Sequence, residues 1–375
     1  MTRHWLSISR SGVMLASGVL ALGLSTWLGG DLARAADLPK QPEKLTTSQA
    51  VDAYMAVLLD EHQTNIRRNY AGAKIVELGK PAVPVILDRY KAAGRDERGY
   101  LASLLGAMGK SDEAEAVLLA DLKDHKLAVH ANVIKALGEM NSSKALPVLI
   151  KLLPGADGNA AEPGLRLTML HAIADSGDET AAAVLMDGLD DRDRLVRSTC
   201  GNGLVGVLKR GQETMKKAEV RTDRDSAKEA YDKVLNDVTD YCKDGKCEDS
   251  RLILISGLGE LNDLRAAKDL LDVLDNGSTV LRTAAAETLG KLRAQSAERR
   301  LTDMLKDKDA VLRTAAVKAL AMIGDRRCVP GLMEYLKTAP IGERKEIVKS
   351  LRTLTGQGFG ESWEAWQTWW TSQEH

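Results

Sequence analysis

Apolar residues recur at three- and four-residue spacing along most of the chain, and no alternating pattern predicts a β-strand. The pattern is clearest in segments 280–290, VLRTAAAETLG, and 311–321, VLRTAAVKALA, which lie 31 residues apart. Both segments are predicted to be helices, because a 3.6-residue period places their Leu and Ala positions on one face. Self-similarity at this period indicates stacked repeats, each of which buries its apolar face on its neighbours.

Two further motifs divide each repeat into a first and a second helix. Second helices begin with a proline motif, Ala-Val-Pro-Val at 82–85, Ala-Leu-Pro-Val at 145–148 and Cys-Val-Pro-Gly at 328–331. Proline is tolerated there because an N–H group in the first turn of a helix has no acceptor within the helix, so no hydrogen bond is lost. First helices tend to end in a glycine, which we expect to adopt a left-handed turn. These glycines are Gly79, Gly109, Gly138, Gly259, Gly290 and Gly324.

Segment 311–330 carries nearly the whole pattern, V-R-x-A-A-x-x-A-L-G followed by a turn with Asp and A-V-P-x-L, and resembles the short HEAT-like repeats of bacteria. Such repeats also occur in phycobilisome lyases. The resemblance implies an all-α, right-handed α-α superhelix, a solenoid of about eight helical pairs over residues 47–355. It also implies a binding surface on a concave face lined by second helices. Candidate partner-binding residues there are Arg89, Lys151, Asp187, Asp269, Asp272, Arg299, Asp303 and Glu334.

The period is broken in two places. Residues 154–164, PGADGNAAEPG, form a turn-rich insertion. A larger, charged insertion covers about residues 209–250, where we expect a lengthened helix at roughly Asp225–Cys242. Insertions in a solenoid map to loops on one face, which is often the binding face. The alternative is a solvated loop without a binding role.

The N-terminus has the composition of a secretory signal. Two arginines precede an apolar run at 13–28, and Ala33-Arg34-Ala35 is a small-x-small cleavage site. We expect cleavage after Ala35, a polar linker at 36–46, and a periplasmic or secreted protein. A membrane anchor is the rival hypothesis, which the short, glycine-bearing run disfavours.

Charge and hydropathy narrow the range of partners. Cleavage removes three basic residues and one acidic residue, which changes the net charge from −1 to −3. This near-neutral balance argues against nucleic acid or an anionic membrane as the main partner. No later apolar run is long enough to cross a bilayer, so no integral membrane segment is expected after cleavage. The mixed charges on the second helices suit a protein partner instead.

Motifs that suggest catalysis or cofactor binding lack the context they require. Gly201–Gly206 fits G-x-G-x-x-G, but it falls inside a predicted helix and not between a strand and a helix. Gly109-Lys110-Ser111 imitates a phosphate loop but lacks the required first glycine. His171 and Asp175 could hydrogen-bond, an arrangement more often structural than catalytic. We therefore predict no catalytic, cofactor-binding or metal-binding residues.

The four cysteines fall into two groups. Cys242 and Cys247 flank an Asp-Gly turn, and in an exported protein this pair is predicted to form a structural disulfide. Metal binding and a redox role are less favoured, because no histidine lies nearby and four residues separate the two cysteines. Cys200 and Cys328 lie in predicted helices and are expected to be buried and unpaired.

The C-terminal tail, residues 356–375, concentrates the aromatic residues of the mature chain. Four tryptophans occupy its last thirteen residues, and the only phenylalanine, Phe359, precedes them. On a helix the four rings fall within a stripe about 120° wide. The preferred interpretation is a helix that caps the apolar end of the solenoid. The alternative is an aromatic patch that binds a partner, a glycan or a membrane edge. Its candidate residues are Trp366, Trp369 and Trp370, with Trp369 expected to be the most exposed.

Three hypotheses for function follow. The leading one is a non-catalytic exported scaffold that holds another protein on its concave face. The second is an enzyme or a lyase-like accessory chain that cradles a substrate, which would need ionisable groups around a deep pocket. The third is cell-envelope or glycan binding through the tryptophan tail, which requires Trp366 and Trp370 to be exposed.

Overall fold

The computed structural model describes residues 45–60, 62–123, 131–153, 163–177 and 179–373. The predicted signal peptide and nearly all of the linker lie outside these residues, as does most of the 154–164 insertion. The chain divides into two compact units, Met1–Ala181 and Ala182–His375, which we describe separately. In the described residues both units consist of α-helices and short 3₁₀ turns without a β-strand, and the solenoid fold expected from the repeats is confirmed.

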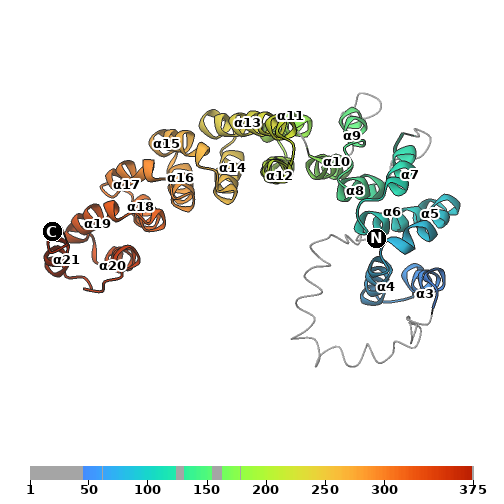
Figure 1. The fold of residues 1–375 in the computed structure, drawn as a ribbon, viewed down its shortest axis with the longest axis horizontal. Coiled ribbons are helices and arrows are strands. Elements are labelled where there is room, and N and C mark those ends of the chain that lie inside the picture. Colours follow the sequence, from blue (N-terminus) through green and yellow to red (C-terminus); the bar gives the residue numbers. More distant parts are fainter. Residues whose placement is uncertain (1–44, 61, 124–130, 154–162, 178, 374–375) are drawn as a thin grey trace. The chain divides into compact units, whose positions relative to one another are not determined.

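The N-terminal unit pairs its helices in two layers (Figure 1). Its helices are α3 (Thr47–Leu59), α4 (Asn65–Glu77), α5 (Val83–Ala92), α6 (Arg95–Ala107), α7 (Asp112–Lys123), α8 (Ala131–Glu139), α9 (Leu146–Leu152) and α10 (Pro163–Ser176). The helices α4, α6, α8 and α10 stack on one another and are the first helices of their pairs. The second helices of this unit are α5, α7 and α9. Helix α11 (Glu179–Asp187), the second helix after α10, straddles the boundary between the units.

The C-terminal unit repeats this arrangement. Its helices are α12 (Arg194–Lys217), α13 (Arg221–Asp244), α14 (Glu248–Leu261), α15 (Ala267–Asn276), α16 (Thr279–Lys291), α17 (Glu298–Met304), α18 (Ala310–Ile323), α19 (Val329–Thr338), α20 (Ile341–Thr355) and α21 (Trp363–Thr371). The first helices α12, α14, α16, α18 and α20 stack in chain order. The second helices α13, α15, α17 and α19 form the other layer (Figure 1).

The repeated sequence explains why each first helix forms and stops. In α16 the side chain of Ser278 accepts a hydrogen bond from the Leu281 amide at 3.3 Å, which caps an otherwise unpaired donor. In α18 Asp309 has the same role toward the Val311 amide at 2.9 Å, and Gly324 ends the helix at φ 77°. Most Leu and Ala positions between these ends are buried, as the apolar pattern predicts, while Ala310 at the start of α18 is exposed.

Glycines of the first helices have two different roles. Gly79, Gly109 and Gly324 have the positive φ that the predicted turn requires. Gly138, Gly259 and Gly290 do not, because the left-handed residue comes three positions later, at Asn141, Asn262 and Arg293. Two of these three glycines lie instead where neighbouring helices approach closely. A Cβ atom on Gly290 would lie 2.9 Å from the Ala319 Cα atom, and one on Gly138 would lie 2.7 Å from that of Ala172.

A repeated arginine ties each first helix to the second helix before it. Arg251, Arg282, Arg313 and Arg344 follow one another at the 31-residue period. Arg282 Nε donates to the Leu274 carbonyl at 3.0 Å, near the end of α15, and Arg344 Nε donates to the Ala339 carbonyl at 3.1 Å, after α19. A cation there satisfies carbonyls that have no partner within the helix and opposes the negative end of the helix dipole.

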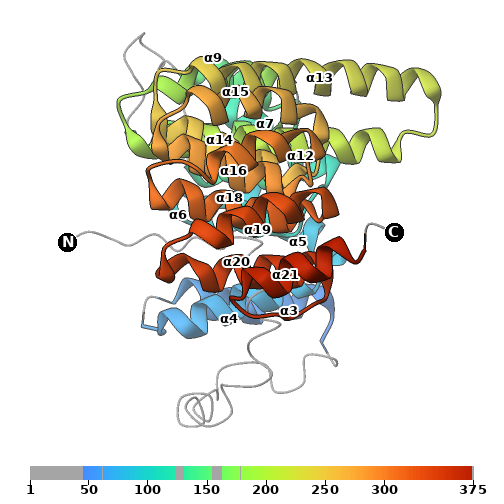
Figure 2. The ribbon, with the colours of Figure 1, turned by 90° about the vertical axis from the view of Figure 1, so that its left-hand side faces the viewer.

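The charged insertion is a long helical hairpin. Helices α12 and α13 have 24 residues each, so the structure lengthens both helices, and the expected helix at Asp225–Cys242 lies inside α13. Tyr231 joins the two helices to the next pair, because its hydroxyl donates to Asp263 at 2.8 Å and accepts from Gln212 at 3.1 Å. The end of the hairpin extends past the other helices of this unit (Figure 2).

Candidate interaction surface

The second-helix residues predicted to bind a partner do not lie on the inner side of the C-terminal unit. Figure 1 shows α13, α15, α17 and α19 on the outer side of its curve and the first helices on the inner side. This arrangement contradicts the predicted concave position of five residues, Asp269, Asp272, Arg299, Asp303 and Glu334. Asp187, Arg89 and Lys151 also lie on second helices, α11, α5 and α9. Two of these predicted residues already form ion pairs within the chain, Arg89 with Asp52 and Asp269 with Lys243 at 3.0 Å.

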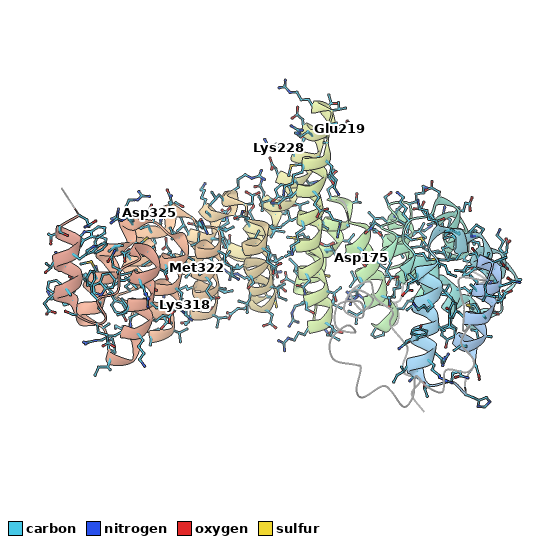
Figure 3. All side chains as sticks on the ribbon, turned by 60° about the horizontal axis from the view of Figure 1, so that its bottom comes forward. Asp175, Glu219, Lys228, Lys318, Met322 and Asp325 are labelled. Atoms are coloured by element: carbon cyan, nitrogen blue, oxygen red, sulfur yellow. The ribbon has the colours of Figure 1, made fainter. Side chains whose placement is uncertain are left out.

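The inner side presents one regular face from each first helix. The 31-residue period places four solvent-facing positions in register on four successive helices. We call these sixteen residues the inner surface: Asp249, Leu252, Ser256 and Glu260 on α14, Val280, Thr283, Glu287 and Lys291 on α16, Val311, Thr314, Lys318 and Met322 on α18, and Gly342, Lys345, Lys349 and Thr353 on α20. Figure 3 shows two of them, Lys318 and Met322, on the side turned toward the viewer.

A hollow lies between α16 and α18 on this surface. Its volume is about 300 Å³, and it is lined by Thr283, Glu287, Ala310, Val311, Thr314, Ala315 and Lys318. The two threonines and the small alanines leave room between the helices, while Glu287 and Lys318 stand at its margin as exposed charges. A hollow of this size and lining suits one or two apolar side chains of a partner.

Exposed apolar side chains concentrate on the first helices. Val280 is 49% exposed, Val311 is 57% exposed and Ile341, at the start of α20, is 82% exposed. Leu195 on α12 and Met322 on α18 are also exposed, as are Ile66 and Tyr70 on α4. Among the described residues, the other large exposed apolar side chains are Val220, before α13, and Leu264, in a 3₁₀ turn. Exposed apolar groups that recur in register indicate an interaction face.

The charges of the inner surface are only partly compensated within the chain. Glu260 pairs with Lys209 at 2.5 Å, and this hydrogen bond lowers the pKa of its carboxyl. Asp249 forms an ion pair with Arg197 at 3.1 Å. Glu287, Lys291, Lys318 and Lys345 make no ion pair within the described residues. These four charges are therefore available to a partner.

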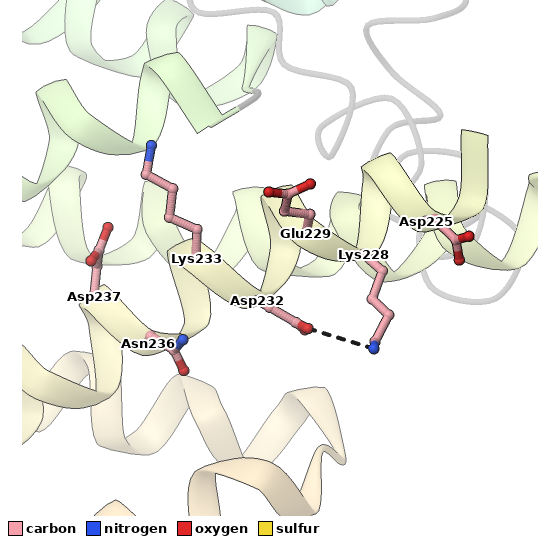
Figure 4. A pocket seen from close by; sticks show the side chains of 7 residues that line it. All are labelled: Asp225, Lys228, Glu229, Asp232, Lys233, Asn236 and Asp237. Carbon is pink, nitrogen blue, oxygen red and sulfur yellow. Dashed lines mark ion pairs between the residues drawn. The ribbon is translucent and has the colours of Figure 1, made fainter. Parts of the chain in front are cut away.

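The α12–α13 hairpin carries a face that is wholly polar, unlike the inner surface. A depression of about 590 Å³ on α13 is lined by Asp225, Lys228, Glu229, Asp232, Lys233, Asn236 and Asp237 (Figure 4). Lys228 forms an ion pair with Asp232 at 3.9 Å. Asp232 forms a second ion pair with Arg265, which belongs to the next repeat. All seven residues lie on one helix and none is apolar, which is typical of a solvated helix face.

The tryptophan helix α21 packs against α19. Trp366 is fully buried, its Nε1 donates to the Gly360 carbonyl at 2.8 Å, and its ring meets Phe359 edge-on at 5.0 Å. Trp363, Trp369 and Trp370 are half-buried. Lys337 lies 4.5 Å from the Trp363 ring centroid, and the Arg326 guanidinium lies 5.7 Å from that of Trp370. The burial of Trp366 removes this residue from the predicted partner-binding patch.

The disulfide predicted between Cys242 and Cys247 is absent from the structure, in which both residues are separate thiols. Cys242 is fully buried near the end of α13, and burial raises the pKa of its thiol. Cys247 is half-buried just before α14. Arg251 holds the intervening loop instead, because its Nε donates to the Cys242 carbonyl at 2.8 Å. Cys200 and Cys328 are buried, as expected.

The glycine motif and the histidine singled out in the sequence both lie inside helices and make contacts there. Gly201–Gly206 lies within α12, where a Cβ atom on Gly201 would lie 2.9 Å from Ile253, so this glycine permits close helix packing. His171 Nδ1 lies 2.8 Å from the carbonyl oxygen of Leu167 in its own helix. Among the described residues, no group of three or more His, Cys, Asp or Glu side chains is arranged to hold a metal ion. No helix in that part of the chain has the length and apolar character that a membrane span requires.

Comparison with known proteins places HEAT repeats in both units. Residues 83–160 and 267–352 match the family model for HEAT repeats. No curated protein matches the chain. Human deoxyhypusine hydroxylase in complex with glycerol is a similar solved structure, with 18% identity over 83% of this chain and 98% of that one and a TM-score of 0.31.

Two other solved structures are similar to this chain. The complex of CpcE and CpcF of phycocyanin lyase from Nostoc sp. PCC7120 is 16% identical over 83% of this chain and 95% of that one, with a TM-score of 0.31. Kap95p, in a structure with RanGDP, is 13% identical over 93% of this chain and 56% of that one, with a TM-score of 0.48. At these identities the likeness concerns the fold alone.

Proposed function

We propose that the protein is an exported, non-catalytic scaffold that binds another protein through the inner surface of its C-terminal unit. One observation carries this proposal: the large apolar side chains exposed on that unit's α-helices lie on first helices, and three of them, Val280, Val311 and Met322, belong to the inner surface. Interfaces of this kind combine a central apolar patch with a rim of polar groups. Glu287, Lys291, Lys318 and Lys345 supply the rim.

Export is the part of the proposal that rests on the sequence. The basic head, the apolar run and the Ala33-Arg34-Ala35 site support secretion with cleavage. Intact-mass measurement of the protein from the envelope or medium of its native host tests this. We expect a mature chain that begins at Ala36, whereas a chain that keeps its first residues contradicts cleavage.

A crosslinked pull-down from the native envelope fraction tests the binding surface. The mature protein is compared with V280S/V311S, which removes two exposed apolar side chains from the inner surface. The matched control, V220S/L264S, removes two exposed apolar side chains that lie elsewhere. We expect one protein to be captured by the wild type and the control and lost with V280S/V311S, with circular dichroism confirming that all three fold. Equal capture by all three contradicts the proposed surface.

A version that ends at Thr355 examines the tail in the same experiment. The complete burial of Trp366 supports a capping role, so capture is expected to survive truncation wherever the array stays folded. Loss of capture by a folded, truncated array supports the alternative of an aromatic binding site.

A further inference from the structure

The inner surface becomes basic toward the C-terminus. On α14 its charges are Asp249 and Glu260, both paired with basic residues of α12. On α16 the surface carries one charge of each sign, Glu287 and Lys291. On α18 and α20 its charged residues are all basic: Lys318, Lys345 and Lys349. Arg352, exposed on α20, adds a further positive charge beside them. Lys349 alone of these is compensated on its own helix, by Glu346 at 3.6 Å.

The apolar part of the surface lies beside these lysines. Val311 and Thr314 line the hollow on α18 together with Lys318. Val280 lies one period before Val311 on α16, and Met322 follows Lys318 by one helical turn. A ligand that covers the hollow therefore meets the apolar Val311 and Ala315 side chains, and its end toward α20 meets lysines.

We propose that α16, α18 and α20 bind an acidic amphipathic helix of a partner protein. Its apolar side chains fill the hollow between α16 and α18, and its carboxylates lie over Lys318, Lys345 and Lys349. This inference rests on the proposed function and specifies the partner of the same surface. These helices offer no strand edge to an extended backbone, so a segment whose backbone groups are already hydrogen-bonded within it fits the surface better.

The spacing of the repeats predicts the spacing of the partner's acidic residues. Packed neighbouring helices lie about 8–10 Å apart. A helix that crosses them rises 1.5 Å per residue, so it passes from one first helix to the next in about five to seven residues. Glutamate or aspartate at i and i+7 would then face Lys318 and Lys349, which occupy the same register position on α18 and α20.

A nucleic acid fits this surface less well. A polyanion gains its affinity from many phosphate contacts, whereas this surface offers a few lysines beside apolar side chains. A competing oligonucleotide in the binding experiment tests this distinction.

Fluorescence anisotropy with designed peptides tests the inference. The probe is a labelled helical peptide of about three heptads, with Leu on one face and Glu at seven-residue spacing. One control peptide has Lys in place of Glu, and the other keeps the composition but shuffles the Leu positions. The mature protein is expected to bind the acidic amphipathic peptide alone, with an affinity that falls as salt rises. Equal binding of either control peptide, or displacement by a single-stranded oligonucleotide, overturns the inference.

Charge-reversal variants locate the binding site. K318E/K349E on the inner surface is expected to weaken binding of the acidic peptide about tenfold or more, because two favourable contacts become repulsive. K268E/R299E makes the same change in net charge on the second helices α15 and α17 and is expected to bind within about twofold of the wild type. Circular dichroism confirms that both variants fold. Equal weakening by the two variants overturns the assignment to α18 and α20.

Photo-crosslinking distinguishes a surface that binds no protein from one that binds a protein without an acidic helix. A photo-crosslinking residue at position 318 reports whether any protein contacts the inner surface in the native envelope. Crosslinking there without binding of the acidic peptide overturns the acidic helix and leaves the scaffold standing. Crosslinking confined to position 303, on the second helix α17, overturns both.

Discussion

Trp366 is predicted to hold the C-terminal end of the array closed. Its side chain is fully buried and makes a hydrogen bond to the Gly360 carbonyl and ring contacts with Phe359 and Trp369. A buried tryptophan removes about 200 Å² from water, which corresponds to about 5 kcal/mol at 25 cal/mol per Å². This figure is an upper bound because the unfolded chain already buries part of the surface. We therefore expect Trp366→Ala to lower the free energy of unfolding by about 3–4 kcal/mol.

The loss should be local. Each repeat contacts its neighbours alone, so removing the cap weakens the last pairs before the rest of the array. Urea unfolding followed by circular dichroism measures the total change without relying on the fluorescence of the deleted residue. Hydrogen exchange should then show faster exchange in α19 and α20 and unchanged exchange in α14.

Two other variants make this prediction refutable. Trp366→Phe keeps an aromatic ring and is expected to cost about 1–2 kcal/mol. Trp369→Ala removes a half-buried ring of the same cluster and should cost less than Trp366→Ala. The capping role is refuted if Trp366→Ala changes stability by less than about 0.5 kcal/mol. It is refuted equally if Trp369→Ala proves the more damaging of the two.

Three further predictions concern packing, charge and thiols. Gly290→Ala is expected to cost about 1–3 kcal/mol in urea unfolding, because the added methyl group would meet the backbone of α18. The hydrogen bond from Arg313 lowers the pKa of Glu343 below its ordinary value of 4.5, so the stabilisation is present above about pH 4.5 and is lost as the pH falls through the lower, folded-state value. Acid unfolding of Arg313→Ala should accordingly show a weaker dependence on pH than that of the wild type. Iodoacetamide should modify Cys247 in the native protein before Cys242, because burial raises the pKa of the Cys242 thiol.

Each of these predictions has its own control. Gly358→Ala adds a methyl group where no atom lies within 4 Å, so it should be nearly neutral, and equal costs for both glycines would contradict the packing argument. Arg299→Ala, at an exposed position, should leave the pH dependence unchanged. If neither Cys242 nor Cys247 reacts after unfolding without a reductant, the two are joined by a disulfide and the separate thiols of the structure are wrong.

Local pattern was enough to predict the helices and the way they stack. The burial of Leu281, Ala285 and Leu289 follows from their 3.6-residue spacing, and the period of 31 residues places equivalent residues in register. For Gly138 and Gly290 the local sequence predicts the wrong role, because a helix-terminal glycine and a packing glycine have the same local pattern. Their difference depends on Ala172 and Ala319, which lie in the next repeat.

The candidate surface was harder to predict because it depends on which layer lies inside the curve. The family resemblance assigned the concave face to second helices, whereas the C-terminal unit turns its first helices inward (Figure 1). The repeat motif itself predicts which of its residues face solvent. In Val-Leu-Arg the leucine is buried and the arginine holds the preceding helix, so Val280 and Val311 must face solvent. An exposed valine repeated in register indicates a surface that something covers.

The most direct test of the scaffold compares photo-crosslinking from two faces of the same repeat. A photoreactive residue replaces Lys318 on the inner surface or Asp303 on the second helix α17, and each variant is expressed in the native host. We predict a discrete crosslinked protein from position 318 and none from position 303. Crosslinking from position 303 alone, or the same products from both positions, would contradict binding through the inner surface.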